Sequence, residues 1–298
     1  MKILNLFSAV TFLLITLFSV FYFSCSKQRT ETQLNSYSPV NSYLNSKEQP
    51  EQTFTIDSNG TCPIVGRDST KIWPSKQCLV YPNGDSVHFP FAIKLVELYT
   101  AKDMIYYEMP TVSGGTILKT DGEIRLRAFK GTTELALRPS PCGYQIEMPC
   151  AAPQSGMDAF YGTTTNNHPD WINTPLTPFT TNTASYTAFV QILGWINCGQ
   201  PTGNPPTSTL TFTSTTDDLT NVGIFIYIPA TKTVMQAYNS TTTAIPNGSA
   251  VKIVAIGVNA SGNLFSFYQT QTVSSNSTIS ITLNATTDAA LTTLLSGL

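Results

Sequence analysis

Hydrophobic and polar residues alternate along many short segments of the chain, and a period of two is typical of β-strands with one buried face. The clearest case is EIRLRAF, residues 123–129, where Ile124, Leu126 and Ala128 are expected to face a core and Glu123 to face water with the two arginines. Similar segments lie at residues 94–99, 104–109, 135–137, 144–148 and 186–193. We therefore predict a β-rich region with no helix of ordinary length between its strands.

A short segment without core-forming side chains, residues 200–206 (QPTGNPP), follows this region, and its adjacent prolines indicate a linker. Beyond it, alternating and apolar stretches resume, and the chain closes on residues 288–298, where Asp288 can cap a helix with its leucines on one stripe. The pattern predicts an all-β fold with two β-sandwich-like domains, residues 53–199 and 207–298. The second has the size of an immunoglobulin-like domain and is expected to fold alone.

The N-terminus carries an almost unbroken apolar run, residues 3–23, followed by Ser24 and Cys25. Such a run indicates an export signal or a retained anchor, because about 20 apolar residues can span a bilayer. The cysteine favours export, since a small residue directly before it resembles a bacterial lipobox, in which the thiol receives diacylglycerol before the chain is cut. We predict a lipoprotein signal peptide over residues 1–24 and lipidation at Cys25.

Residues 25–52 are rich in Ser, Asn, Gln and Glu and have no apolar period, so they are expected to form a flexible tether. The whole chain is 41% hydrophobic and only 11% charged, against about 25% in typical soluble domains, so hydroxyls and amides replace charges on its surface. The net charge of −2 provides no basic stripe. Nucleic acid is therefore not an expected partner.

Cysteine usage is compatible with an oxidising compartment. Besides Cys25 the chain has five cysteines, so one thiol stays unpaired and 15 pairings are open by arithmetic. Short loops favour disulfides from Cys62 to Cys78 and from Cys142 to Cys150, with Cys198 left reduced. The alternative is that all five are buried small hydrophobic residues.

Candidate catalytic chemistry is sparse. The chain has two histidines, lacks the H-E-x-x-H and G-x-S-x-G motifs, and has no C-x-x-C spacing, so we assign no catalytic residue, no metal ligand and no cofactor. His168 and Asp170 in HPDW are the best candidate for a base with a carboxylate, and a solvated loop histidine is the simpler interpretation. Several carboxylates could form a glycosidase pair, but a sequence does not show the separation that such a pair needs.

A binding role agrees better with the sequence. The segment from residue 156 to residue 183 contains the aromatic residues Phe160, Tyr161, Trp171 and Phe179 among Asn, Thr and Pro, a candidate surface for a glycan or a peptide. The alternative is that these rings fold back onto the core of the first domain.

A series of short motifs resembles an uncharacterised family of cell-envelope lipoproteins of the Bacteroidota. The motifs are Asp103-Met104-Ile105, Pro110-Thr111, Ser113-Gly114-Gly115, Thr120-Asp121-Gly122-Glu123, Met157-x-x-Phe160-x-Gly162 and Leu193-Gly194-Trp195-Ile196-Asn197-Cys198. Where the family continues with Asp-Arg-Phe, this chain has Gly199-Gln200-Pro201. The resemblance implies an envelope location and β-rich domains, and it carries no established activity.

The sequence therefore predicts a lipid-anchored protein of the outer membrane, with surface exposure slightly favoured over the periplasmic face. Its expected partners are the membrane, through the lipid, and a glycan, a peptide or another envelope protein. A non-catalytic binding or scaffolding module is the favoured function, and a carbohydrate-active or proteolytic envelope enzyme is the alternative.

Overall fold

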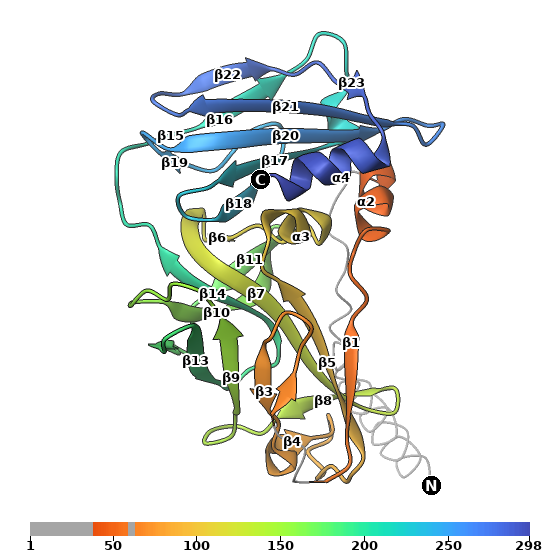
Figure 1. Ribbon diagram of the computed structural model, residues 1–298, viewed down its shortest axis with the longest axis vertical. Helices are drawn as coiled ribbons and strands as arrows, with labels where there is room; N and C mark the ends of the chain where they lie inside the picture. Colours follow the sequence, from red (N-terminus) through yellow and green to blue (C-terminus); the bar gives the residue numbers. More distant parts are fainter. Residues whose placement is uncertain (1–37, 59–62) are drawn as a thin grey trace, which may run out of the picture. The chain divides into compact units, whose positions relative to one another are not determined.

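The computed structural model describes residues 38–58 and 63–298, and antiparallel strands dominate this part of the chain (Figure 1). The described residues contain five sheets and three short α-helices and belong to one compact unit. The predicted all-β class and the short C-terminal helix are both confirmed.

The largest sheet has nine strands. Its main path runs in the order β1 (Gln52–Ile56), β5 (Phe91–Leu98), β7 (Thr116–Lys130), β14 (Gly194–Pro201), β10 (Asp158–Thr165) and β11 (His168–Ile172). Three more strands lie off this path: β8 (Thr133–Leu137) pairs with β7 and β4 (Leu79–Val80), and β6 (Val112–Ser113) pairs with β7. A 3-10 helix, η1 (Lys76–Cys78), directly precedes β4.

A second sheet, which we call the small sheet, packs against the nine-stranded one. It contains β12 (Thr180–Thr181), β13 (Ser185–Val190), β9 (Tyr144–Pro149), β3 (Lys71–Trp73) and β2 (Ile64–Val65), in that order. Its inward side chains, among them Ile72, Ile146 and Ala188, join Ile93 and Leu126 of the nine-stranded sheet in one buried cluster. Two sheets that share a core in this way form a β-sandwich.

The C-terminal sheet has five strands: β18 (Thr233–Gln236), β17 (Val222–Ile228), β20 (Ala250–Val258), β21 (Leu264–Thr272) and β23 (Asn284–Ala285). Smaller pairs accompany it, namely parallel β16 (Leu210–Thr213) with β22 (Ser277–Ser280) and antiparallel β15 (Thr207–Ser208) with β19 (Ile245–Pro246), and η2 (Leu219–Asn221) precedes β17. Ile224 and Ile226 of β17 pack with Phe212 of β16, whereas Phe225 packs on the opposite face. Because both faces are covered, β17 has a continuous apolar sequence.

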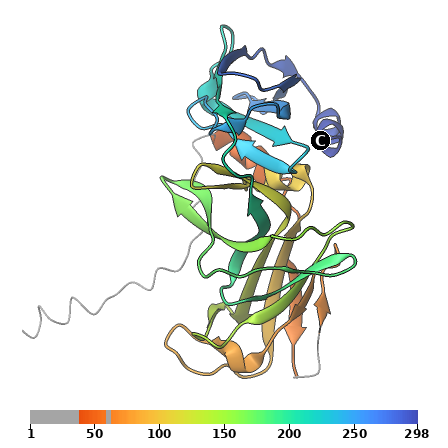
Figure 2. The ribbon, with the colours of Figure 1, turned by 90° about the vertical axis from the view of Figure 1, so that its left-hand side faces the viewer.

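Two helices cover that opposite face of the C-terminal sheet (Figures 1 and 2). One is the predicted terminal helix, α4 (Asp288–Ser296), which buries Leu291 and Leu295 and whose N-cap is Thr287, one residue before the expected Asp288. The Thr287 side chain accepts the amide of Ala290, which satisfies one of the free donors of the first turn.

The other covering helix corrects the predicted tether. Residues 38–52 are ordered: α2 (Ser38–Asn45) is followed closely by β1, and Val40 and Leu44 are fully buried against the C-terminal sheet. Val40, Tyr43 and Leu44 have the i, i+3, i+4 spacing of one helix face, and that face has an apolar surface to cover. The rest of the predicted tether and the signal peptide, residues 1–37, lie outside the described residues.

A third helix, α3 (Ala101–Tyr106), occupies part of the segment that alternation predicted as a strand at residues 104–109. Thr100 caps it by accepting the amide of Asp103, and Met104 and Ile105 become buried. A capped helix of six residues forms its backbone hydrogen bonds internally and needs no strand partner, so the period of two was misleading here.

Strand β7 also differs from its prediction at one position. Ile124, Leu126 and Ala128 are buried as expected, but Glu123 is buried too, where Asn197 Nδ2 of β14 donates to its Oε1 over 3.0 Å. Burial raises the pKa of the Glu123 carboxyl group well above its ordinary value. The structure buries both faces of β7 at this point, which the local alternation does not reveal.

The two predicted domains meet where β7 and the segment around β6 contact β18 and the turn before it. Thr111 and Val234 exchange hydrogen bonds of 2.8 and 3.0 Å, and Lys232 forms an ion pair of 2.6 Å with Asp121. The predicted linker begins inside a strand, because β14 extends to Pro201, whose register partner is Leu118. The independent folding of residues 207–298 stays a prediction.

Candidate functional site

The four aromatic residues of the predicted binding surface are all buried, so that surface is not the one the protein presents. Phe160, Tyr161, Trp171 and Phe179 are between 1% and 6% exposed. The indole Nε1 of Trp171 donates to the Pro110 carbonyl over 2.7 Å, inside the fold. The rings fold back onto the core because β10 and β11 join the nine-stranded sheet as a hairpin and turn their large side chains inward.

The cysteine pairing also differs from the prediction. The structure has one disulfide between described cysteines, from Cys78 to Cys142, with Cα atoms 5.1 Å apart. Cys150 is free and partly exposed, and Cys198 is free and buried, as expected for the unpaired thiol. Cys62 lies outside the described residues.

Strand geometry explains this pairing. Strand β9 separates Cys142 from Cys150, and its six residues in extended form hold the two ends about 20 Å apart, too far for a disulfide. By contrast, β4 pairs with β8, and the Arg138 amide donates to the Cys78 carbonyl over 2.8 Å. This pairing brings η1 beside the turn that contains Cys142.

The candidate base and carboxylate have structural roles in β11. The Asp170 carboxylate accepts the amides of Gly114 and Trp171, each over 2.8 Å. The His168 ring stacks on Tyr238 with centroids 3.5 Å apart, and partial burial lowers the pKa of its imidazole. These contacts attach β11 to its neighbours and supply no pair aimed at a common point.

A cavity of about 570 Å³ is lined by charged residues, but the contacts of its carboxylates stabilise the fold. Asp121 accepts from Tyr186 Oη over 2.6 Å and pairs with Lys232, and Asp103 accepts from Gln49 Nε2 over 3.1 Å. Within residues 38–58 and 63–298, no group of three or more His, Cys, Asp or Glu side chains could hold a metal ion.

A different surface has the character of a ligand site: the face of the small sheet that points away from the core. On β3 and β9, residues alternate between this face and the core, as Ile72 between Lys71 and Trp73 illustrates. Strand register then places these outward residues in two rows across the sheet, which we call together the outer face. One row is Phe189, Gln145 and Trp73, and the other is Thr180, Thr187, Glu147, Lys71 and Val65.

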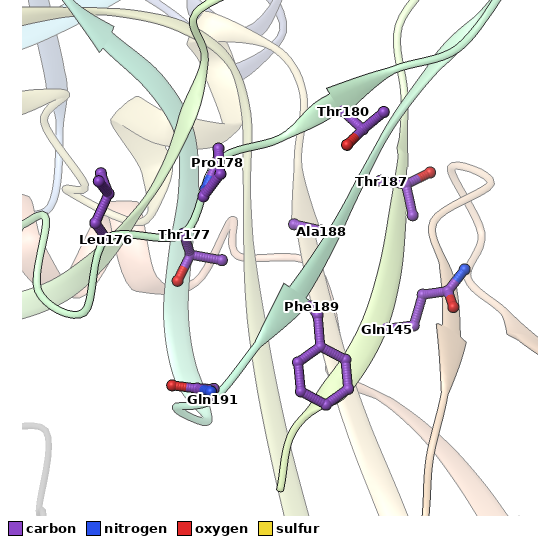
Figure 3. Close-up of a pocket in the computed structure, with 9 residues that line it drawn as sticks. All are labelled: Gln145, Leu176, Thr177, Pro178, Thr180, Thr187, Ala188, Phe189 and Gln191. Carbon is purple, nitrogen blue, oxygen red and sulfur yellow. The ribbon is translucent and has the colours of Figure 1, made fainter. Parts of the chain in front are cut away.

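Part of the outer face is a groove of about 460 Å³ (Figure 3). Phe189, Gln145, Thr187 and Thr180 line it from the sheet, and the figure shows the Phe189 ring beside the Gln145 side chain. The Phe189 ring is 49% exposed although it is large and apolar. An exposed aromatic side chain among amides and hydroxyls is typical of a recognition surface.

A glycine fixes the place of that ring. A Cβ atom at Gly143, at the entrance to β9, would lie 2.6 Å from Cε1 of Phe189 and 2.6 Å from the Val190 carbonyl oxygen. The ring therefore lies directly over the Gly143 backbone. Because Gly143 follows Cys142, the disulfide to Cys78 also holds this part of the groove in position.

The loop before β12 forms one wall of the groove, with Leu176 at 70% exposed beside Pro178 (Figure 3). Backbone bonds hold this wall to β10: the Ala159 amide donates to the Thr177 carbonyl over 2.8 Å, and the Phe179 amide donates to the Met157 carbonyl over 2.9 Å. Phe179, predicted as a ligand contact, is instead the buried anchor of this wall, packed edge to face on Tyr186.

Comparisons with protein-family models, with curated proteins and with solved structures found no match for this chain. The outer face is therefore identified as a candidate site by its geometry alone. No described helix has both the length and the apolar character needed to cross a membrane.

Sequence reasoning missed Phe189, Gln145 and Trp73, although one local signal was present. In SYTAFV, the residues of β13, the buried apolar positions are Tyr186, Ala188 and Val190, so Phe189 falls on the polar phase of the strand. An aromatic residue on the phase that faces water is the sequence signal of an exposed ring.

Proposed function

We propose that this protein is a non-catalytic binding module of the cell envelope and that its ligand occupies the groove on the outer face. One observation carries the proposal: the groove is lined by Gln, Thr, Pro, Ala, Leu and Phe side chains, none of which titrates near neutral pH. Acid–base catalysis requires a positioned titratable group, whereas binding requires apolar area and oriented polar groups. The groove lining supplies the apolar area and the polar groups that binding requires, and it contains no titratable group.

The nearest charged side chains of the outer face neutralise each other. Lys71 Nζ lies 2.9 Å from Glu147 Oε1, and the two residues are register partners on β3 and β9. Among the described residues that form the outer face and line the groove, this pair is the only charge, and it sums to zero, which favours an uncharged ligand over a charged one.

Attachment to the membrane through Cys25 is part of the proposal. Its support is the apolar run that ends at Ser24 and Cys25. Residues 26–37 separate Cys25 from α2, and twelve extended residues can span at most about 40 Å. This reach would display the folded part from the lipid surface. An outer-membrane location, with the cell surface favoured over the periplasmic face, belongs to the same proposal.

Lipidation predicts a direct outcome in cells of the natural host or another bacterium with lipoprotein processing. Metabolic labelling with an alkyne fatty acid is expected to mark the wild-type protein and not Cys25→Ala, because the variant lacks the only thiol at the cleavage site. Cys150→Ser serves as the matched control and should label like wild type. Equal labelling of wild type and Cys25→Ala would contradict the lipid anchor.

Binding without turnover distinguishes the module from a carbohydrate-active or proteolytic enzyme. The full chain is incubated with insoluble polysaccharides and with immobilised casein and gelatin, and both retention of the protein and release of reducing ends or new amines are measured. We expect retention on at least one polymer without product. Product release that is lost in Asp121→Asn or His168→Ala would favour the enzyme, and absence of retention on every polymer would contradict the binding module.

A further inference from the structure

Resting on the proposed function, we propose that the ligand of the outer face is an uncharged glycan chain that crosses the strands of the small sheet and stacks its sugar rings on Phe189 and Trp73. Trp73, the second platform, does not line the groove itself. The register, the side-chain chemistry and the charge of the outer face together favour this ligand class.

The register places two aromatic side chains in one row. Phe189 of β13 and Trp73 of β3 are both partners of Gln145 on β9, one from each side. Neighbouring strands lie about 4.8 Å apart, so the two platforms are about 10 Å apart. Each sugar ring of an extended glycan chain has a flat apolar face. The separation of the two aromatic side chains allows two sugars of one chain to stack on them, with one further sugar or one turn of the chain in between.

The polar groups of the outer face match a ligand rich in hydroxyls. The amide of Gln145 both donates and accepts, and the hydroxyls of Thr180 and Thr187 do the same, so each can pair with a sugar hydroxyl in either direction. Lys71 is paired with Glu147, so the two described rows of the outer face carry no net positive charge for a sulfated or uronic acid polymer. An anionic glycan would therefore lose water without gaining a charge partner.

A peptide suits this surface less well. Extended peptides gain affinity chiefly by adding a strand to a free sheet edge, where backbone groups are unpaired. At the centre of the row of Phe189, Gln145 and Trp73, strand β9 is paired on both sides, with β13 and with β3, so a chain that crosses the row there meets no free backbone groups. Affinity on this face must come from side chains, as it does in stacking on aromatic rings.

The site is also preformed, because the Gly143 backbone lies under the Phe189 ring and the Cys78–Cys142 disulfide holds that segment. A ring that is already in place loses little freedom when a ligand stacks on it. Phe189 and Trp73 are thus expected to contribute to affinity out of proportion to their area.

Affinity electrophoresis tests the proposal. The full chain, in a polyoxyethylene detergent that has no sugar headgroup, migrates through native gels containing laminarin, mannan, xyloglucan, dextran or hydroxyethyl cellulose, and through gels containing polygalacturonate, hyaluronan or gelatin. We expect retardation by at least one of the uncharged polysaccharides and by none of the other three polymers. Phe189→Ala and Trp73→Ala are each expected to weaken the retarding interaction about tenfold, equivalent to about 1.4 kcal/mol.

Three variants control for folding and for unspecific effects. Phe189→Tyr and Trp73→Phe keep a ring at each platform and should retain most of the affinity. Tyr268→Ala removes an aromatic side chain of β21 that is 45% exposed, similar to Phe189, and should leave affinity unchanged. Thermal unfolding of every variant establishes that it is folded.

The outcomes separate the two proposals. Retardation only by polyanions or by gelatin, or retardation by an uncharged glycan that both alanine variants retain, would overturn the glycan inference and leave the binding module in place. Absence of retardation by all eight polymers, together with no retention in the binding assay, would overturn both.

Discussion

Replacing Trp171 with alanine is expected to lower the free energy of unfolding by about 4 kcal/mol, because loss of a buried tryptophan removes a large apolar side chain and leaves a cavity. The Trp171 side chain is 1% exposed, and its Nε1 donates over 2.7 Å to a Pro110 carbonyl that would lose this partner. Urea-induced unfolding, followed by circular dichroism, measures the change. The variant should melt early or fail to accumulate in its folded form.

Two further variants identify the cause. Trp171→Phe keeps a ring and loses the indole donor, so it is expected to be less destabilised than the alanine variant. Phe189→Ala removes an aromatic side chain that is half exposed, and it should change stability by about 1 kcal/mol or less. If Trp171→Ala unfolds like wild type and instead weakens ligand binding, then the ring is a surface contact and its burial in the fold is contradicted.

Local alternation was enough to predict β9 and β13, in which one face is buried and the other faces water. In β9 and β13 the buried apolar residues follow a period of two, and these strands were correctly predicted near residues 144–148 and 186–193. Glu123 shows the limit of this reasoning, because its burial depends on Asn197, 74 residues further along the chain. No local pattern contains that contact.

The predictions for the helices and for the aromatic residues were wrong for a related reason. Helix α2 has only eight residues, so its stability depends on the sheet face that Val40 and Leu44 cover, and a short isolated helix is marginal in water. The Asn, Thr and Pro residues around Phe160 and Trp171 likewise indicated a polar segment with exposed aromatic rings. Their burial follows from the pairing of β10 with β14 and β11, which a sequence does not specify.

The candidate site could not have been assembled from the sequence. Trp73, Gln145 and Phe189 are more than 40 residues apart from one another, and only the order β13, β9, β3 brings them into one row. The sequence does show, from the alternation within each strand, whether a residue lies on the buried or the exposed face. Alternation therefore identifies an exposed ring, but the register between strands decides which rings share a surface.

Removal of the Cys78–Cys142 disulfide is expected to cost about 4 kcal/mol of unfolding free energy, because the bond closes a loop across a sequence separation of 64 residues and restricts the unfolded chain. The double variant Cys78→Ser with Cys142→Ser avoids a stray thiol. Guanidinium unfolding of wild type should shift to lower denaturant on addition of reductant, whereas the double variant should already be shifted and should not respond further.

The same bond is expected to influence the groove, which gives the prediction a second readout. Cys142 precedes Gly143, whose backbone lies under the Phe189 ring, and Cys78 lies five residues after Trp73. Loosening both segments should weaken ligand retention under conditions where the variant is still folded. Cys150→Ser is the matched control, because Cys150 is free and partly exposed, and it should leave both stability and retention unchanged. If reductant changes neither the unfolding nor the ligand retention of the wild-type protein, a structural role for the disulfide is contradicted.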